Sequence, residues 1–210
     1  MHHRDILNLQ ISDEACEKVA DELHEVYVRT EGKAFAEIYD TNGLSADEIC
    51  RVRLLTANQD FRGSRNFKEL SEIYLSDPTI FDEKQIINSP ADFVKSIGIT
   101  ELSQNHKRVR YAKQISQFLL EHNSAPYDII KVFDNDVTRL RNALIEFDGA
   151  GYGNKKTDMF IRDMVVLGVW NRVKGFDDID VASDVNTIKI ALRTGILTSE
   201  IPLISSFLDI

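Results

Sequence analysis

Helical periodicity constrains the fold of this chain more than any other feature of its sequence. Apolar residues recur three or four positions apart along most of the chain, a spacing that places them on one face of an α-helix. One such series comprises Cys16, Val19, Ala20, Leu23, Val26 and Tyr27. No alternating run of strand length interrupts these series, and 210 residues contain only 10 glycines and 4 prolines. The pattern therefore predicts an all-α protein.

Local signals predict where several helices begin and end. Ser45 and Glu48 have the spacing of a capping box, in which each side chain accepts a hydrogen bond from the backbone N–H of the other residue. Asp77 and Ser89 each precede a proline, which is typical of an N-cap followed by the first helical residue. The longest periodic series predicts a helix over residues 105–121, and a shorter one predicts a helix that ends near residue 147.

Composition excludes several classes of protein. The hydrophobic fraction of 43% is enough for a core and argues against intrinsic disorder. No segment approaches the ~18 consecutive apolar residues of a membrane span, and the first residues lack the apolar core of a signal peptide, so we expect a cytoplasmic protein. Two cysteines and five scattered histidines do not form a recognisable ligand set. We therefore expect no metal and no cofactor.

Charge is distributed unevenly along the chain. The net charge of −9 argues at first against a nucleic-acid partner, because phosphate binding favours Lys and Arg. Residues 1–100 carry 11 basic and 19 acidic side chains, and residues 176–210 carry 2 and 6. Residues 101–175 carry 12 basic and 9 acidic side chains, a local excess of +3. The central part of the chain therefore remains compatible with an anionic partner.

A glycine cluster lies in this basic part, between two expected helices. Gly149, Gly151 and Gly153 precede Asn154 and Lys155, where the second helix is expected to begin. Glycine permits a tight turn and a close backbone approach, and the N–H groups at a helix start attract phosphate. The sequence therefore indicates a phosphate-binding hairpin. An ordinary tight connection between two helices is the alternative interpretation.

Two segments resemble the helix-hairpin-helix DNA glycosylases of base-excision repair. Residues 147–157 read FDGAGYGNKKT, similar to the hairpin of that family, and residues 183–197 read SDVNTIKIALRTGIL, similar to its downstream aspartate motif. The resemblance covers about residues 45–200 and is greatest to the archaeal 8-oxoguanine glycosylase branch. The chain departs from the family pattern at Asp148, where the family has proline, and at Asn186, where it has histidine.

The resemblance implies a fold of two helical lobes with the active site in the cleft between them. Residues 1–210 would form a single glycosylase unit. One lobe would combine residues 1–45 with residues 176–210. The other would comprise residues 46–175 and contain the hairpin at residues 148–155.

The resemblance also implies an enzyme, a DNA N-glycosylase with AP-lyase activity that removes an oxidised purine such as 8-oxoguanine. In such a reaction a neutral lysine amine attacks the sugar C1′, and the resulting Schiff base permits β-elimination. The lysine-threonine pair favours Lys156 as the nucleophile, and the glycine spacing leaves Lys155 as an alternative. Asp184 would stabilise the cationic sugar.

The remaining expectations concern binding. Duplex DNA with a damaged base would contact Gly149, Gly151, Gly153, Asn154 and Lys155. Candidates for a base pocket are Asn58, Gln59, Phe61 and Trp170. We expect a monomer that associates with the nucleoid and not with a membrane. Two alternatives remain open, a non-catalytic helix-hairpin-helix module that binds DNA or a repair partner, and an all-α scaffold in which the hairpin is only a turn.

Overall fold

The computed structural model describes residues 8–32, 41–59, 66–99, 104–181 and 185–199. The candidate residues Phe61 and Asp184 lie outside these ranges. The chain divides into two units, of which unit 1 combines residues 1–35 with residues 182–210 and unit 2 comprises residues 36–181.

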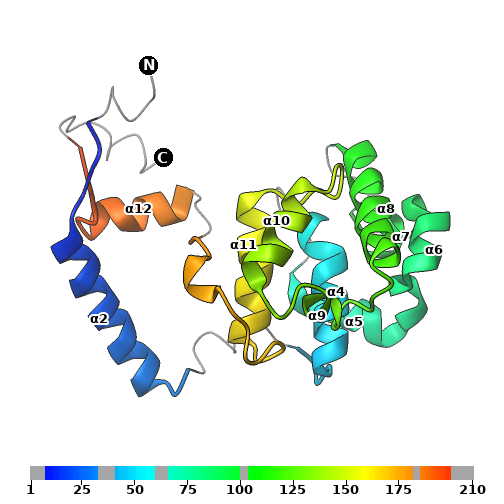
Figure 1. Ribbon diagram of the computed structural model, residues 1–210, viewed down its shortest axis with the longest axis horizontal. Helices are drawn as coiled ribbons and strands as arrows, with labels where there is room; N and C mark the ends of the chain where they lie inside the picture. Colours follow the sequence, from blue (N-terminus) through cyan, green and yellow to red (C-terminus); the bar gives the residue numbers. More distant parts are fainter. Residues whose placement is uncertain (1–7, 33–40, 60–65, 100–103, 182–184, 200–210) are drawn as a thin grey trace. The chain divides into compact units, whose positions relative to one another are not determined.

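Apart from an isolated β-bridge between Asp136 and Lys174, the regular secondary structure in the described residues of unit 2 is helical, as the sequence predicts (Figure 1). Its α-helices are α4 (Ala46–Thr56), α5 (Phe67–Ser76), α6 (Glu83–Asn88), α7 (Pro90–Ser96), α8 (Asn105–Glu121), α9 (Ile129–Val132), α10 (Val137–Glu146) and α11 (Asn154–Val166). Three 3-10 turns connect them, η1 (Ala57–Gln59), η2 (Pro78–Phe81) and η3 (Phe176–Asp178).

Helix α4 forms the centre of unit 2. Its side chains Cys50, Val52, Leu54 and Leu55 are completely buried. Helices α5, α8 and α11 contact α4 from different sides, α8 also packs against α6 and α7, and α10 packs against α11 (Figure 1). This arrangement places η1, which directly follows α4, against both α8 and α11.

Capping interactions explain where these helices begin. The Ser45 hydroxyl accepts from the backbone N–H of Glu48, whose carboxylate accepts from the backbone N–H of Ser45 at 2.8 Å. Asp77 caps η2, and Pro78 and Pro90 occupy first-turn positions. Helix α8 spans Asn105–Glu121, the range that the periodicity predicts. Local sequence chemistry thus determines most of these boundaries.

The described part of unit 1 comprises two helices, α2 (Asp13–Arg29) and α12 (Val185–Arg193), and two strands, β1 (Gln10–Ile11) and β2 (Leu197–Thr198). The strands pair antiparallel, with Gln10 opposite Thr198. The sequence predicts no strand, because two residues are too short to show an alternating pattern. Neither helix buries a described side chain, and Leu23 on the apolar stripe of α2 is 63% exposed.

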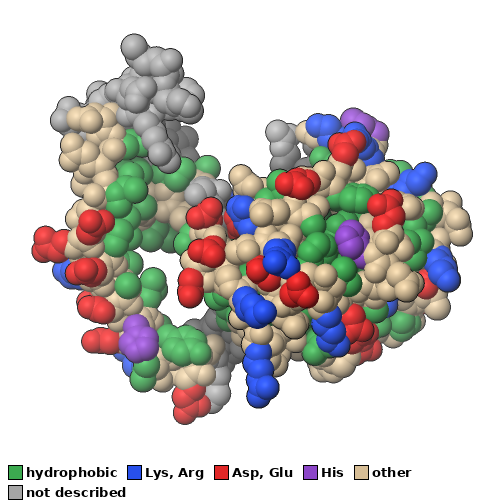
Figure 2. Space-filling model, in the orientation of Figure 1, with side chains coloured by type: hydrophobic (Ala, Val, Ile, Leu, Met, Phe, Trp, Pro, Cys, Tyr) green, Lys and Arg blue, Asp and Glu red, His purple; other side chains and the backbone are tan. Residues whose placement is uncertain are grey.

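No helix in the described parts of either unit combines the length and the apolar character required to cross a membrane. Acidic side chains line α2, in contrast to the mixed charge over unit 2 (Figure 2). The basic excess that the sequence places in residues 101–175 therefore lies in unit 2.

Candidate functional site

A glycine turn, residues 147–153, joins α10 to α11. Phe147 ends α10, and Gly149 and Gly151 both have a φ of +76°, in the left-handed region that favours glycine. Gly153 is the N-cap of α11, with an extended backbone at φ −101°. No side chain caps the first turn of α11. The start of this 13-residue helix therefore offers its backbone N–H groups at the surface of the turn.

Helix α8 lies directly against the glycine turn (Figure 1). A Cβ atom on Gly151 would lie 2.5 Å from the ring of Tyr111, and one on Gly149 would overlap the guanidinium of Arg110. Gly151 is therefore required both by its backbone angle and by the space that the Tyr111 ring occupies. At Gly149 the exposed Arg110 side chain could move aside, so the backbone angle is what requires glycine there. Gly153 differs, since a Cβ there would meet no atom within 4 Å.

Asn58 connects α8 to the glycine turn from within the core. Its side chain is completely buried, and its Nδ2 atom donates to the carbonyl oxygens of Ala150 at 2.8 Å and Tyr111 at 3.2 Å. The neighbouring Gln59 donates to the carbonyl of Arg108, whose guanidinium donates back to the carbonyl of Gln59 at 2.6 Å. The 3-10 turn η1 is thus fixed to α8 by reciprocal hydrogen bonds.

Two buried acceptor atoms at η1 have no hydrogen-bond partner among the described residues, Asn58 Oδ1 and Gln59 Oε1. A buried polar atom without a partner is costly, so each such atom in a folded protein calls for an explanation. The sequence proposes both residues for a base pocket. Their unused oxygen atoms are suited to accept from the N–H groups of a bound base.

Lys156 lies in the first turn of α11 and reaches back to η1. Its Nζ atom donates to the carbonyl oxygen of Asn58 at 2.5 Å and lies 5.6 Å from the centroid of the Tyr111 ring. The side chain is half-buried, whereas Asn154 and Lys155 are exposed. The two lysines that the sequence leaves as alternatives therefore occupy different environments, and the Lys156 amine is held against η1 by a hydrogen bond to the backbone of η1.

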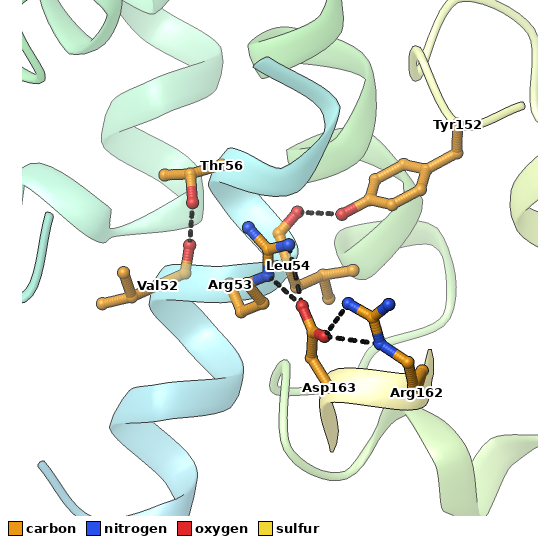
Figure 3. A network of polar contacts seen from close by, with 7 residues as sticks. All are labelled: Val52, Arg53, Leu54, Thr56, Tyr152, Arg162 and Asp163. Atoms are coloured by element: carbon orange, nitrogen blue, oxygen red, sulfur yellow. Dashed lines mark hydrogen bonds and ion pairs between the residues drawn. The ribbon is translucent and has the colours of Figure 1, made fainter. Parts of the chain in front are cut away.

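Buried ion pairs fix α11 in position behind the turn (Figure 3). The carboxylate of Asp163 accepts from Arg53 on α4 at 2.8 Å and from Arg162 at 2.8 Å. Asp158 forms a second ion pair with Arg141 on α10, and this contact raises the pKa of the Arg141 guanidinium. Removing one partner of a buried pair is strongly destabilising. These contacts thus hold α4, α10 and α11 in one rigid arrangement around the glycine turn.

Tyr152, in the glycine turn itself, is anchored in the core. Its hydroxyl donates to the carbonyl oxygen of Leu54 at 2.6 Å (Figure 3). Burial raises the pKa of the Tyr152 phenol, so the group stays neutral and serves as a hydrogen-bond donor. Together with Asn58, this residue attaches both sides of the turn to the α4–η1 segment.

The structure brings together most of the candidate residues that it describes. Asn58, Gln59 and Lys156 meet at η1, and Lys156 directly follows Asn154 and Lys155 in the first turn of α11. Trp170 lies elsewhere in the core, where its Nε1 atom donates to the carbonyl of Tyr127 and its ring packs edge-on against Phe160. Phe61 and Asp184 lie outside the described residues, so their positions remain predictions.

Arg110 and Tyr111 were not predicted as site residues, and they lie against Gly149 and Gly151, the two glycines of the turn with left-handed backbone angles. A signal for Arg110 exists, because residues 105–120 contain four Lys or Arg and no acidic residue. Among the described residues, no group of three His, Cys, Asp or Glu side chains lies close enough to hold a metal ion.

Comparisons of the chain with protein-family models, with curated proteins and with solved structures find no match. The site is therefore characterised by its geometry. It combines a helix N-terminus without a side-chain cap, a turn that requires two glycines and a half-buried lysine amine held against η1.

Proposed function

We propose that this protein is a base-excision repair enzyme, a DNA glycosylase with AP-lyase activity that removes an oxidised purine such as 8-oxoguanine. One observation carries the proposal. The amine of Lys156 is half-buried at the start of α11, between the Asn58 carbonyl and the Tyr111 ring. The residues there resemble the helix-hairpin-helix hairpin of the glycosylases. A nucleophilic amine and a phosphate-binding helix start thus occupy the same turn.

The glycine turn and the start of α11 would bind the DNA backbone. Backbone N–H groups of Asn154 and Lys155 would contact phosphate oxygens, and the Lys155 side chain would add a positive charge. The open space around Gly153 leaves room for a phosphate to approach the helix start. This mode of binding reads the backbone and not the base sequence.

Lys156 would act as the nucleophile once its amine has lost a proton. The amine forms a bond to C1′ of the sugar, and the bond from C1′ to the damaged base breaks with its electron pair leaving on the base. The sugar ring then opens: the C1′–O4′ bond breaks, O4′ takes up a proton to become a hydroxyl, and the nitrogen of Lys156 forms a Schiff base with C1′. The Schiff base makes the C2′ proton acidic, and loss of this proton expels the 3′ phosphate. Asp184 would stabilise the cationic sugar, and Asn58 Oδ1 and Gln59 Oε1 would accept from the extruded base.

A non-catalytic helix-hairpin-helix module is the second candidate. The observation in its favour is the hydrogen bond from Lys156 to the Asn58 carbonyl, which occupies the amine and suits its protonated form. In that case Lys156 would fix η1 to α11, and the protein would bind DNA without cleaving it.

Borohydride trapping separates the two candidates. The full-length protein is incubated with a labelled duplex that carries 8-oxoguanine opposite cytosine, and with a second duplex that carries an abasic site. We expect a covalent adduct with the wild type and with the exposed-lysine control Lys84→Gln, and none with Lys156→Gln. An adduct that persists in Lys156→Gln and disappears in Lys155→Gln would transfer the role to Lys155.

Duplex binding without adduct or cleavage on either substrate would support the module and contradict the enzyme. Size-exclusion chromatography with light scattering tests the proposed monomer. Fluorescence imaging of a tagged chain tests the proposed association with the nucleoid.

A further inference from the structure

An exposed ion pair lies beside the glycine turn. Arg110 on α8 donates from Nη2 to Oδ2 of Asp148 at 2.6 Å, and the two side chains are 55% and 92% exposed. Exposed pairs contribute little to the stability of a fold, about 0–1 kcal/mol. The ion pair therefore contributes little to the stability of the fold, although the backbone of the glycine turn leaves space for it.

Gly149 provides the space for this arrangement. With a φ of +76° and no side chain, it lets the guanidinium of Arg110 lie over the turn where a Cβ would overlap it. The turn therefore leaves room for the Arg110 guanidinium, and the ion pair with Asp148 holds it there. The Arg110 guanidinium is accessible to solvent. The first turn of α11 begins a few residues after Gly149 in the sequence.

Further cations accompany Arg110 on α8. Lys107, Arg110 and Lys113 are three residues apart and all exposed, so they lie on neighbouring positions of one helix face. No acidic residue occurs between Asn105 and Leu120. Basic side chains gather at the edge of unit 2 where α8 meets the turn (Figure 2). Asp148 thus pairs with Arg110, the central one of these three cations.

We propose that the exposed face of α8, centred on Arg110, binds a second stretch of the DNA backbone, and that Asp148 occupies this position as a phosphate mimic until DNA displaces it. The proposal rests on the proposed DNA binding by the glycine turn and extends it. A carboxylate and a phosphate oxygen form the same kind of charge-assisted hydrogen bond with a guanidinium. The two anions therefore compete for Arg110.

Asp148 accordingly lowers the affinity of the protein for any DNA duplex. It also makes binding more sensitive to the negative charge of the molecule that competes for Arg110. A phosphate that reaches Arg110 must displace the Asp148 carboxylate and overcome the repulsion between the two negative charges. Salt screens this repulsion at distances beyond about 8–10 Å. Removing the Asp148 charge should therefore strengthen binding, and removing Arg110 should weaken it.

Fluorescence anisotropy tests the proposal with a labelled 20-base-pair duplex that contains a tetrahydrofuran abasic analogue, at several NaCl concentrations between about 50 and 200 mM. We expect Asp148→Asn to bind about 3- to 10-fold more tightly than the wild type. We expect Arg110→Gln to bind about 5- to 10-fold more weakly, with a salt slope reduced by about one. In the Arg110→Gln background, Asp148→Asn should change the affinity for DNA by less than about twofold, because the guanidinium for which the carboxylate and the phosphate compete is absent.

The chain offers a matched control pair, Asp134 and Arg139. Their atoms also lie 2.6 Å apart, their side chains are 71% and 62% exposed, and they are at the other end of α10 from the turn. Asp134→Asn and Arg139→Gln remove the same charges, and we expect each to change affinity by less than about twofold.

The outcomes separate this proposal from the proposed function. Equal effects of Asp148→Asn and Asp134→Asn would mean a general charge effect and would overturn the role of Asp148. An unchanged salt slope in Arg110→Gln would overturn the α8 surface, while DNA binding that depends on Lys155 and Lys156 would leave the proposed function intact. A wild type that binds no duplex would overturn both.

Discussion

The carboxylate of Asp163 accepts a hydrogen bond from Arg53 Nε at 2.8 Å, and this buried ion pair joins α11 to α4 across 110 residues of sequence. Asp163→Asn keeps the shape of the side chain but leaves two arginines without their carboxylate. We expect the free energy of unfolding to fall by about 3 kcal/mol or more in urea titrations. Asp134→Asn, which removes an exposed pair, should cost less than about 1 kcal/mol. Equal losses in the two variants would contradict the structural importance of the buried pair.

The two kinds of glycine in the turn should respond differently to substitution. Gly151→Ala introduces a Cβ at a φ of +76° and 2.5 Å from the Tyr111 ring, and we expect a loss of about 2 kcal/mol in stability. Gly153→Ser is the control, because its extended backbone and open surroundings accept a side chain. A serine N-cap should leave the melting temperature unchanged or raise it. A tolerated Gly151→Ala would show that α8 can move away from the turn.

Asp136, the N-cap of α10, should contribute to the pH dependence of stability. Its pKa lies below the ordinary value of 3.8, mainly because the Thr138 hydroxyl donates to it and also because the backbone N–H of Arg139 does. The stabilisation is therefore fully present above pH 3.8 and is lost as the pH falls through the lowered pKa. As the pH is lowered from about 5 to about 2, the melting temperature should fall less steeply in Asp136→Asn, which keeps the cap without the charge. Thr138→Val should bring the transition closer to the ordinary pKa, and an unaltered profile in both variants would exclude this linkage.

The side-chain amide of Asn58 should be needed to attach the glycine turn to η1 and α8. Asn58→Asp replaces a donor with a carboxylate that faces the carbonyl oxygens of Ala150 and Tyr111, so we expect a loss of about 2–3 kcal/mol at neutral pH. Asn171→Asp is a suitable comparison, since its amide also donates to a backbone carbonyl but is exposed. It should cost less than about 1 kcal/mol. Chemical denaturation of both variants measures the difference, and similar values would argue that the buried bridge is not needed.

The fold was predictable wherever neighbouring residues determine it. The range 105–121 follows from periodicity, and the capping box of Ser45 and Glu48 follows from two side chains three positions apart. The glycine turn is also a local signal. These features depend on short-range chemistry that is fully present in the sequence.

The internal arrangement of the site depends on distant contacts and could not be predicted in the same way. Asn58 reaches Ala150 across 92 residues, and Lys156 reaches the carbonyl of Asn58 across 98. The sequence leaves Lys155 and Lys156 as alternatives because only packing distinguishes the exposed side chain from the half-buried one. The contact between Arg110 and the turn likewise depends on how α8 packs, and no local pattern encodes it.

The pairing of β1 with β2 has a consequence for the order in which the chain folds during synthesis. Residues 10–11 emerge from the ribosome long before their partners, residues 197–198, have been translated. Everything that unit 2 needs has been translated before that partner strand exists. Unit 2 should therefore be able to reach its native packing on the nascent chain before β1 can pair with β2, which requires residues 197–198 to have been translated.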